Sequence, residues 1–348
     1  MKSAISFLAI ILFSISALAQ RTLIVDNTGS APNGDHVYSD LRTAIEDALS
    51  GDIIQIMPSP TAYTTIYIRN KSNIKIVGAG FNTDLVNSNE KGRSIISNSF
   101  NFGDGSSGIV VDGVVLAGGI VVENTSNNIV QNCEVDDLIL TTTVGRSVSN
   151  FIFRNNIILG TRFTIPNNGS FSGGVFENNI IVRASGSRMD TNFSTWNNNL
   201  ILGHSNGASL HGIENIFNNN IIQGFTGTNE TNQMIRSVFN NNLMEVDLGQ
   251  NDGSSGDNNI VKSFDLPALF DDERIIANEW DRDWDVTSTS TEVVGTASNG
   301  GNIGPTGSNS GNPYKKIAFS LPTITELTSP LSVKSGQNFE VTIKAKGN

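Results

Sequence analysis

The chain contains a single cysteine, Cys133, and no lysine between Gly92 and Val261. One thiol cannot close an internal disulfide, so packing and hydrogen bonds must hold the fold together. The 33 acidic residues outnumber the 22 basic ones, and the net charge is −11. Nucleic acids and anionic membrane surfaces both require a basic footprint on a protein, so neither is expected as a partner.

Aromatic residues are scarce, at 7% of the chain, whereas glycine accounts for 34 residues and asparagine is abundant. Long blocks of alanine, leucine, glutamate and lysine at helical spacing are also absent, which excludes the helical repeat classes. A chain that is rich in turn formers and poor in helix formers predicts many short β-strands.

The first residues, "MKSAISFLAIILFSISALAQ", combine an early lysine, an apolar run and small residues at Ala17 and Ala19. This pattern predicts a secretory signal peptide over residues 1–19, cleaved before Gln20. No later run reaches about 18 apolar residues, so no membrane insertion is expected. The mature chain should therefore be secreted, and the sequence leaves open whether it is periplasmic or extracellular.

Five strings repeat one pattern, in which an aromatic residue is followed by x-Asn-Asn and two apolar residues. They are "IFRNNII" (152–158), "VFENNII" (175–181), "TWNNNLI" (195–201), "IFNNNII" (216–222) and "VFNNNLM" (238–244). Aligned on the aromatic position, with Val110 and Val130 ahead, the spacings are 20, 23, 23, 20, 21 and 22 residues. A period of about 22 residues with β-branched runs predicts a β-solenoid, whose coils add short parallel strands to long sheets.

At this point residues 22–305 resemble the pectate-lyase-like right-handed parallel β-helix superfamily. The opening "YSDLRTAIEDALSGDIIQIMPSPTAY" (38–63) supports the resemblance, because it predicts a short capping helix near Asp40 to Leu49 before a strand. "VVGTASNGGNIGPTG" (293–307) looks like the Gly-rich closing turn of this group. The resemblance implies an all-β, right-handed parallel β-helix over residues 20–307, but no activity, because the fold serves many functions.

Residues 308–348 differ in composition and predict a linker followed by a short C-terminal β tail. "LSVKSG" (331–336) and "FEVTIKA" (339–345) both alternate, with Ser-Gly-Gln-Asn as the turn between them. Two strands are too few to fold alone, so the tail should cap the last coil, lie along a sheet or begin a further β-sandwich.

The asparagines have a structural interpretation. Asn tolerates the left-handed backbone that a sharp bend between strands requires, and its amide can bond the same amide one coil away. Such a ladder should contain Asn156, Asn179, Asn199, Asn220 and Asn242. An array of ligand-contacting amides is the alternative. Cys133 stands in the same column and should be buried and inert, and the aromatic column should be core.

Arg154 and Glu177 occupy the same outward position on consecutive coils, which predicts a lateral ion pair. An exposed pair of this kind contributes only about 0–1 kcal/mol, so it favours surface patterning over catalysis.

Catalytic residues are harder to identify. A uronate lyase needs calcium or arginine to neutralise a carboxylate, together with a base, and the lysine-free middle leaves arginine and histidine for that role. A glycosidase would need carboxylates on one exposed sheet. The strings "SRMDTNF" (187–193) and "ASLHGIE" (208–214) would gather four candidates on one flank: Arg188, Asp190, His211 and Glu214. The alternative is an ordinary polar surface.

One string resembles a calcium loop. In "DRDWDVTSTSTE" (281–292), Asp281, Asp283, Asp285 and Glu292 match ligand positions 1, 3, 5 and 12. Val286 stands where that loop requires glycine, so an alternating strand with its acids in solvent is the competing interpretation. Calcium is therefore an optional cofactor, and none is required.

Three functions remain open. The first is a non-catalytic extracellular carbohydrate-binding or surface protein, because the catalytic constellations of the fold are missing. The second is a polysaccharide-active enzyme, a uronate lyase before a glycoside hydrolase, because of the fold and the export signal. The third is a structural or assembly element. A polysaccharide or cell-surface glycan is the expected partner, and the oligomeric state is undetermined by the sequence.

Overall fold

The computed structural model describes residues 20–29, 35–64, 66–80, 93–140, 147–159, 163–164, 171–182, 188–203, 209–225, 234–248, 253–270, 288–307, 323–328 and 342–346. The predicted signal peptide lies outside these residues. The helices among them are α2 (Leu41–Asp47) and α3 (Leu266–Leu269), and neither is long and apolar enough to cross a membrane.

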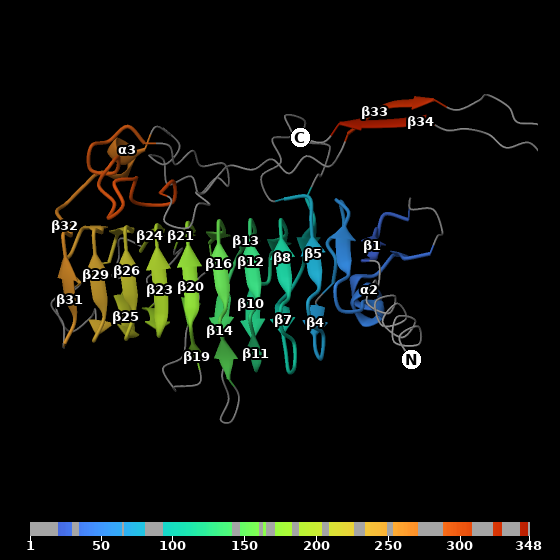
Figure 1. Ribbon diagram of the computed structural model, residues 1–348, viewed down its shortest axis with the longest axis horizontal. Coiled ribbons are helices and arrows are strands. Elements are labelled where there is room, and N and C mark those ends of the chain that lie inside the picture. Colours follow the sequence, from blue (N-terminus) through green and yellow to red (C-terminus); the bar gives the residue numbers. More distant parts are fainter. Residues whose placement is uncertain are drawn as a thin grey trace, which may run out of the picture.

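Short parallel strands stack side by side into three long sheets, which run along the length of the molecule (Figure 1). Sheet A has 12 strands, in the order β2 (Val37–Tyr38), β1 (Thr22–Val25), β3 (Ile53–Ile56), β5 (Lys75–Val77), β8 (Val110–Asp112), β12 (Ile129–Gln131), β16 (Ile152–Arg154), β20 (Gly174–Glu177), β23 (Ser194–Asn197), β26 (Ile216–Asn218), β29 (Val238–Asn240) and β31 (Ser255–Asp257). Sheet B has 9 strands: β6 (Ile95–Ile96), β9 (Val115–Leu116), β13 (Glu134–Val135), β17 (Ile157–Ile158), β21 (Ile180–Val182), β24 (Leu200–Leu202), β27 (Ile221–Gln223), β30 (Leu243–Met244) and β32 (Ile260–Val261).

Sheet C has 8 strands: β4 (Ile66–Ile68), β7 (Phe100–Phe102), β10 (Ile120–Val122), β14 (Leu138–Leu140), β18 (Phe163–Thr164), β22 (Arg188–Asn192), β25 (Ser209–Ile213) and β28 (Met234–Ile235). A small sheet D contains β11 (Thr125–Ser126), β15 (Val148–Ser149) and β19 (Phe171–Ser172). From β5 to β28 the described chain visits sheets A, B and C in that order, coil after coil. The prediction of a right-handed parallel β-helix is confirmed.

The repeated aromatic residues form a continuous stack inside the helix. Phe153, Phe176, Trp196, Phe217 and Phe239 are fully buried, and neighbouring rings are parallel to within 3°, 3°, 13° and 2°. In the alignment of the repeats, the position given to Val110 is wrong by one residue. Val130 pairs with the buried Val111, whereas Val110 points outward, because a shift of one residue moves a strand side chain to the other face.

The x-Asn-Asn step is the bend between sheets A and B. The first asparagine of each pair has a left-handed backbone, with φ of 55° at Asn155, 54° at Asn178, 55° at Asn198, 57° at Asn219 and 53° at Asn241. The second asparagine is buried, and its side chain bonds to the coils on both sides. Its Oδ1 accepts hydrogen bonds from the backbone N–H and the Nδ2 of the preceding coil's asparagine, as Asn220 does from Asn199 at 2.8 and 2.9 Å.

This ladder runs through Asn156, Asn179, Asn199, Asn220 and Asn242, and each Nδ2 also donates to a backbone carbonyl, such as Asn220 to Trp196 at 2.8 Å. Cys133 occupies the position before Asn156, whose Oδ1 accepts its backbone N–H at 3.0 Å. The thiol is fully buried, and this burial raises the pKa of Cys133 to about 12.

Helix α2 covers the first coil. Asp40 is its N-cap and accepts from the backbone N–H of Thr43 at 3.0 Å, and the buried residues Leu41, Ala44, Ile45 and Ala48 pack into the main core. A solenoid end exposes apolar core, and this amphipathic face closes it.

Sheet B carries apolar residues on both faces. The outward residues Ile180, Leu200, Ile221 and Leu243 are fully buried, because they pack against Leu269 and Phe270 and against Val293, Ala297 and Ile303 of the segment 288–307. The side chains of Asn178, Asn198 and Asn219 clamp that segment, for example through the Asn178 Nδ2 bond to the Pro305 carbonyl at 2.8 Å. The segment 293–307, expected as a closing turn, therefore lies along the outer face of sheet B.

The C-terminal tail contains an antiparallel pair, β33 (Thr323–Thr328) and β34 (Thr342–Lys346). The prediction placed one strand at 339–345, which overlaps β34. The partner expected at 331–336 lies outside the described residues, and the observed partner is β33.

Candidate functional site

The outer faces of the three sheets differ in what they offer a ligand. Sheet B is covered by α3 and the segment 288–307. Sheet A exposes a column of mainly β-branched residues beside a polar column, in which Asn218 Nδ2 donates to Asn197 Oδ1 at 3.1 Å and Asn240 Nδ2 to Asn218 Oδ1 at 3.2 Å. Those amides are already bonded to one another, which leaves the outer face of sheet C for a ligand.

The predicted ion pair between Arg154 and Glu177 on sheet A is wrong. The two residues pair in register, but Arg154 donates from Nε and Nη2 to Gln131 Oε1, at 2.8 and 2.6 Å, on the opposite side. Gln131 in turn donates to Asp112, which also pairs with Lys75 at 3.1 Å. The Arg154 guanidinium bonds to Gln131 because the buried carboxylate of Asp112 holds the Gln131 amide in place. No ion pair between Arg154 and Glu177 is present among the described residues.

One column of residues in register runs along seven of the eight strands of sheet C, and its members Tyr67, Asn101, Val121, Asp190 and His211 alternate with buried neighbours and face outward. The strand registers join Tyr67, Asn101, Val121, Ile139, Thr164, Asp190 and His211 in a single line. Seven strands at a spacing of about 4.8 Å make this column about 29 Å long. Two of the predicted residues, Asp190 and His211, thus share one face with Tyr67, which is the exposed aromatic side chain of the described chain.

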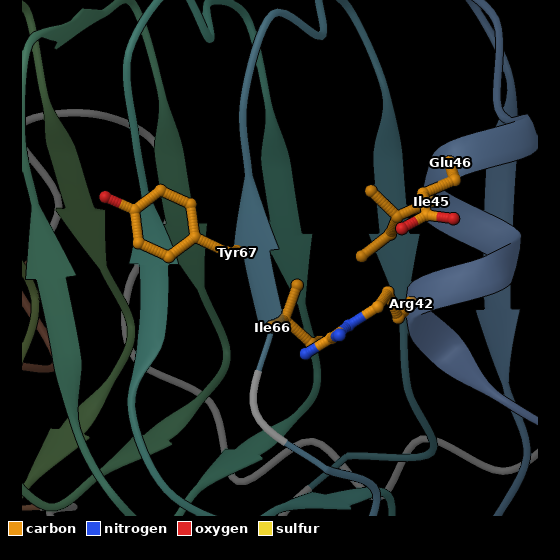
Figure 2. Close-up of a pocket in the computed structure, with 5 residues that line it drawn as sticks. All are labelled: Arg42, Ile45, Glu46, Ile66 and Tyr67. Atoms are coloured by element: carbon orange, nitrogen blue, oxygen red, sulfur yellow. The ribbon is translucent and has the colours of Figure 1, made fainter.

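A groove of about 290 Å³ opens where α2 meets β4, the first strand of sheet C. Its lining comes from both elements: Arg42, Ile45 and Glu46 from α2, and Ile66 and Tyr67 from β4. Figure 2 shows the Arg42 side chain reaching from the helix towards Ile66, whereas the Tyr67 ring points away from the helix over the next strands. Ile45 and Ile66 are buried, and Arg42, Glu46 and Tyr67 are exposed.

Neighbouring groups fix the Tyr67 ring. It lies so close over Gly103, on the next coil, that a Cβ there would collide with a ring carbon. The guanidinium carbon of Arg69 is 3.9 Å from the ring centroid, and the Tyr67 hydroxyl donates to Glu123 at 3.4 Å. Hydrogen bonding to Tyr67 raises the pKa of Arg69, so this guanidinium stays charged. The ring is held on the surface before any ligand arrives.

Arg42 and Glu46 stand one helical turn apart on α2. In the described part of the chain, neither side chain takes part in a hydrogen bond or an ion pair with another residue, nor do they bond each other. A guanidinium with five N–H donors and a carboxylate that only accepts are therefore both available at the mouth of the groove.

Three of the four predicted catalytic residues lie on two adjacent strands at the far end of sheet C: Arg188 and Asp190 on β22, and His211 on β25. Asp190 pairs in register with His211, and Arg188 with Ser209. Thr191 and Leu210 beside them are buried, so Asp190 and His211 alternate to the outer face. The structure does not describe the Arg188 side chain.

Glu214 lies at the turn after β25, where it forms an exposed ion pair with Arg236 of the next coil at 2.8 Å. The backbone at this turn is left-handed, with φ of 51° at Phe193, 54° at Glu214 and 48° at Arg236 on successive coils. Earlier coils place Asn127 or Asn150 at the same turn. A left-handed backbone strains residues with bulky side chains. The sequence did not predict this conformation for Phe193 and Arg236, because the repeat pattern does not extend to this turn.

The predicted metal ligands Asp281, Asp283 and Asp285 lie outside the described residues. Within the ranges that the structure describes, no group of three or more His, Cys, Asp and Glu side chains is arranged to hold a metal ion.

No family model and no curated protein sequence matches this chain. Several solved structures are similar to it, among them two polysaccharide lyases. The crystal structure of pectate lyase Pel9A covers 87% of this chain and 98% of its own, with 14% identity and a TM-score of 0.37. The complex of alginate lyase AlyF-OU02 with G6 covers 83% and 70%, with 14% identity and a TM-score of 0.32. The chain itself has the right-handed parallel β-helix fold that its repeats predict.

Proposed function

We propose that this protein is a secreted, non-catalytic glycan-binding protein, which holds a polysaccharide chain along the outer face of sheet C. The observation that carries the proposal is the uninterrupted column from Tyr67 to His211, which begins at a groove with a fixed, exposed tyrosine. Binding of this kind requires no cofactor.

The geometry suits an extended sugar polymer. Sugar rings present apolar C–H faces and hydroxyl edges, and binding sites for them combine an aromatic side chain with a few placed polar groups. Tyr67 is held by Gly103, Arg69 and Glu123 before the ligand binds, so little side-chain entropy is lost on binding. The strand spacing of about 4.8 Å is close to the length of one pyranose unit, so the chain can repeat its contacts from coil to coil.

Glycan-array screening followed by titration calorimetry tests the proposal. Tyr67→Ala should weaken binding at least about tenfold, as loss of an aromatic anchor does in other interfaces. Ile216→Ala is the matched control, because Ile216 is 42% exposed on sheet A and Tyr67 is 40% exposed on sheet C. Equal losses of affinity in both variants, or a loss in Ile216→Ala alone, would show that the glycan does not bind on sheet C. The absence of binding to any glycan would refute the proposal.

A uronate polysaccharide lyase is the second candidate. Two observations favour it: Asp190 and His211 are neighbours in register near Arg188, and the groove places Arg42 beside a carboxylate. A lyase needs such a base and such a charge partner. Incubation with uronate polymers, followed through the absorbance of unsaturated products, separates the two functions. Product formation that Arg188→Ala or His211→Ala abolishes would establish the enzyme and overturn the non-catalytic proposal.

A further inference from the structure

The groove between α2 and β4 has a charge pattern that bears on the kind of sugar it accepts. Arg42 contributes one positive charge and Glu46 one negative charge, and beside them the Arg69 guanidinium lies over the Tyr67 ring, whose hydroxyl donates to Glu123. Asp40 near Arg42 and Asp104 near Arg69 add two further negative charges, and Lys71, whose Nζ donates to the Glu46 carbonyl at 2.7 Å, adds a positive one. The acids therefore slightly outnumber the bases around the groove, and the whole chain carries a net charge of −11. A ligand with a carboxylate on every unit would meet Glu46 directly and the field of the protein at longer range.

We infer that this groove is a subsite for one neutral pyranose unit, with Arg42 and Glu46 as the residues that recognise its hydroxyl groups. The inference rests on the proposed glycan-binding function and names its substrate class.

Neutral sugars match these two side chains. Each hydroxyl is both a donor and an acceptor, so a pair of adjacent hydroxyls can accept from the Arg42 guanidinium and donate to the Glu46 carboxylate at the same time. Hydrogen bonds to charged groups are stronger than those between neutral groups. Arg42 interacts with Asp40 only through its charge, and neither Arg42 nor Glu46 forms a side-chain hydrogen bond or a close ion pair in the described structure, so no such bond has to break first.

The size of the groove fits a single ring. Its volume of about 290 Å³ is at the lower end for small-molecule sites. Ile45 and Ile66 form an apolar floor below the two charged residues, and Tyr67 leads from the groove onto the open face of sheet C. One unit of a polymer can therefore sit in the groove while the units that follow extend along the column towards His211.

Titration calorimetry of the full chain with two sets of probes tests the inference. One set contains neutral hexasaccharides of glucose, mannose or galactose, and the other hexagalacturonate. At least one neutral probe should bind with an affinity that changes less than about twofold between about 0.05 M and 0.5 M NaCl, because screening affects only charged ligands. Tighter binding of hexagalacturonate, with a strong loss at high salt, would overturn the inference.

Two charge-removing variants give a sign test. For a neutral sugar, Arg42→Gln and Glu46→Gln should each weaken binding, by about tenfold, because each removes a charge-assisted hydrogen bond. For an acidic sugar, Arg42→Gln would weaken binding and Glu46→Gln would strengthen it. Glu292→Gln is the control, since Glu292 lies on the segment that covers sheet B and pairs with Lys262. Arg42 and Glu46 are both exposed, so circular dichroism should show that Arg42→Gln and Glu46→Gln leave the fold unchanged.

Positional variants separate this subsite from the rest of the face. Gly103→Ala should displace the Tyr67 ring and reduce binding, whereas Tyr67→Phe, which keeps the ring, should retain most of it. If Tyr67→Ala weakens binding but both α2 variants bind as the wild type does, the glycan lies on sheet C and the subsite assignment is wrong. If no probe binds at all, the proposed function itself fails.

Discussion

Replacing one ladder asparagine should destabilise the fold far more than replacing its neighbour two residues away. Asn220 Oδ1 accepts from the backbone N–H of Asn199 at 2.8 Å and from its Nδ2 at 2.9 Å. Asn220 Nδ2 donates to the Trp196 carbonyl at 2.8 Å and to Asn242 Oδ1 at 3.0 Å. All four bonds lie in the interior, and Asn220→Ala removes them together.

The magnitude follows from the groups that remain. In Asn220→Ala the buried N–H of Asn199 loses its acceptor, and the Trp196 carbonyl loses this donor. A buried polar group without its partner costs about 1–3 kcal/mol, so the free energy of unfolding should fall by about 3–5 kcal/mol. Asn218→Ala removes two hydrogen bonds from the outer face of sheet A, where water can replace the amide, and should cost less than about 1 kcal/mol.

Urea unfolding followed by far-UV circular dichroism measures both variants. The comparison requires an unchanged dependence of the free energy on urea, since a changed slope would signal partial unfolding of the solenoid. Asn220→Asp adds a pH test, because an ionised carboxylate would face the carbonyl of Trp196 and the amide oxygen of Asn242. Its destabilisation should grow between acid and neutral pH. Equal losses for Asn218→Ala and Asn220→Ala would refute the assignment of the buried column as the structural ladder.

Three further outcomes are expected. Asp40→Ala should lower stability by about 1 kcal/mol, because the cap of α2 at Thr43 is lost, and thermal unfolding would show it. Cys133, whose pKa burial raises to about 12, should resist thiol reagents at about pH 8 in the folded protein and react after denaturation; reaction of the native protein would contradict its burial. Arg236→Asn should raise the unfolding midpoint slightly, because relief of the left-handed backbone, about 1 kcal/mol, exceeds an exposed ion pair; a clear loss would show that the pair with Glu214 dominates.

The fold could be predicted from the sequence because one physical requirement repeats in every coil. The bend between sheets A and B needs a left-handed residue and then a buried amide, and both needs select asparagine. Strings such as "IFNNNII" therefore mark the same place in each coil. The alignment slipped by one residue at Val110, where the coil has no aromatic residue or Asn-Asn step to fix the register.

The groove could not be predicted in the same way. Arg42 and Glu46 come from the capping helix and Tyr67 from the first strand of sheet C, so the site exists only once α2 has packed on that strand. Tyr67 stands outside the repeat pattern, and Gly103, which leaves room for its ring, is one of many glycines. The candidates Asp190 and His211 were found because their strings fall at fixed positions relative to the Asn-Asn bends.

The outward residues of each sheet determine whether another part of the chain covers its outer face. The apolar pairs after each Asn-Asn step illustrate this. In "IFNNNII", Ile222 faces the main core and Ile221 faces outward, yet both are buried. An outward apolar column of this length needs a cover, and the segment 288–307 provides it through Val293, Ala297 and Ile303. Sheet C has a mixed composition. Its column in register combines Val121 and Ile139 with polar residues and with Tyr67, which is 40% exposed and which a glycan can contact.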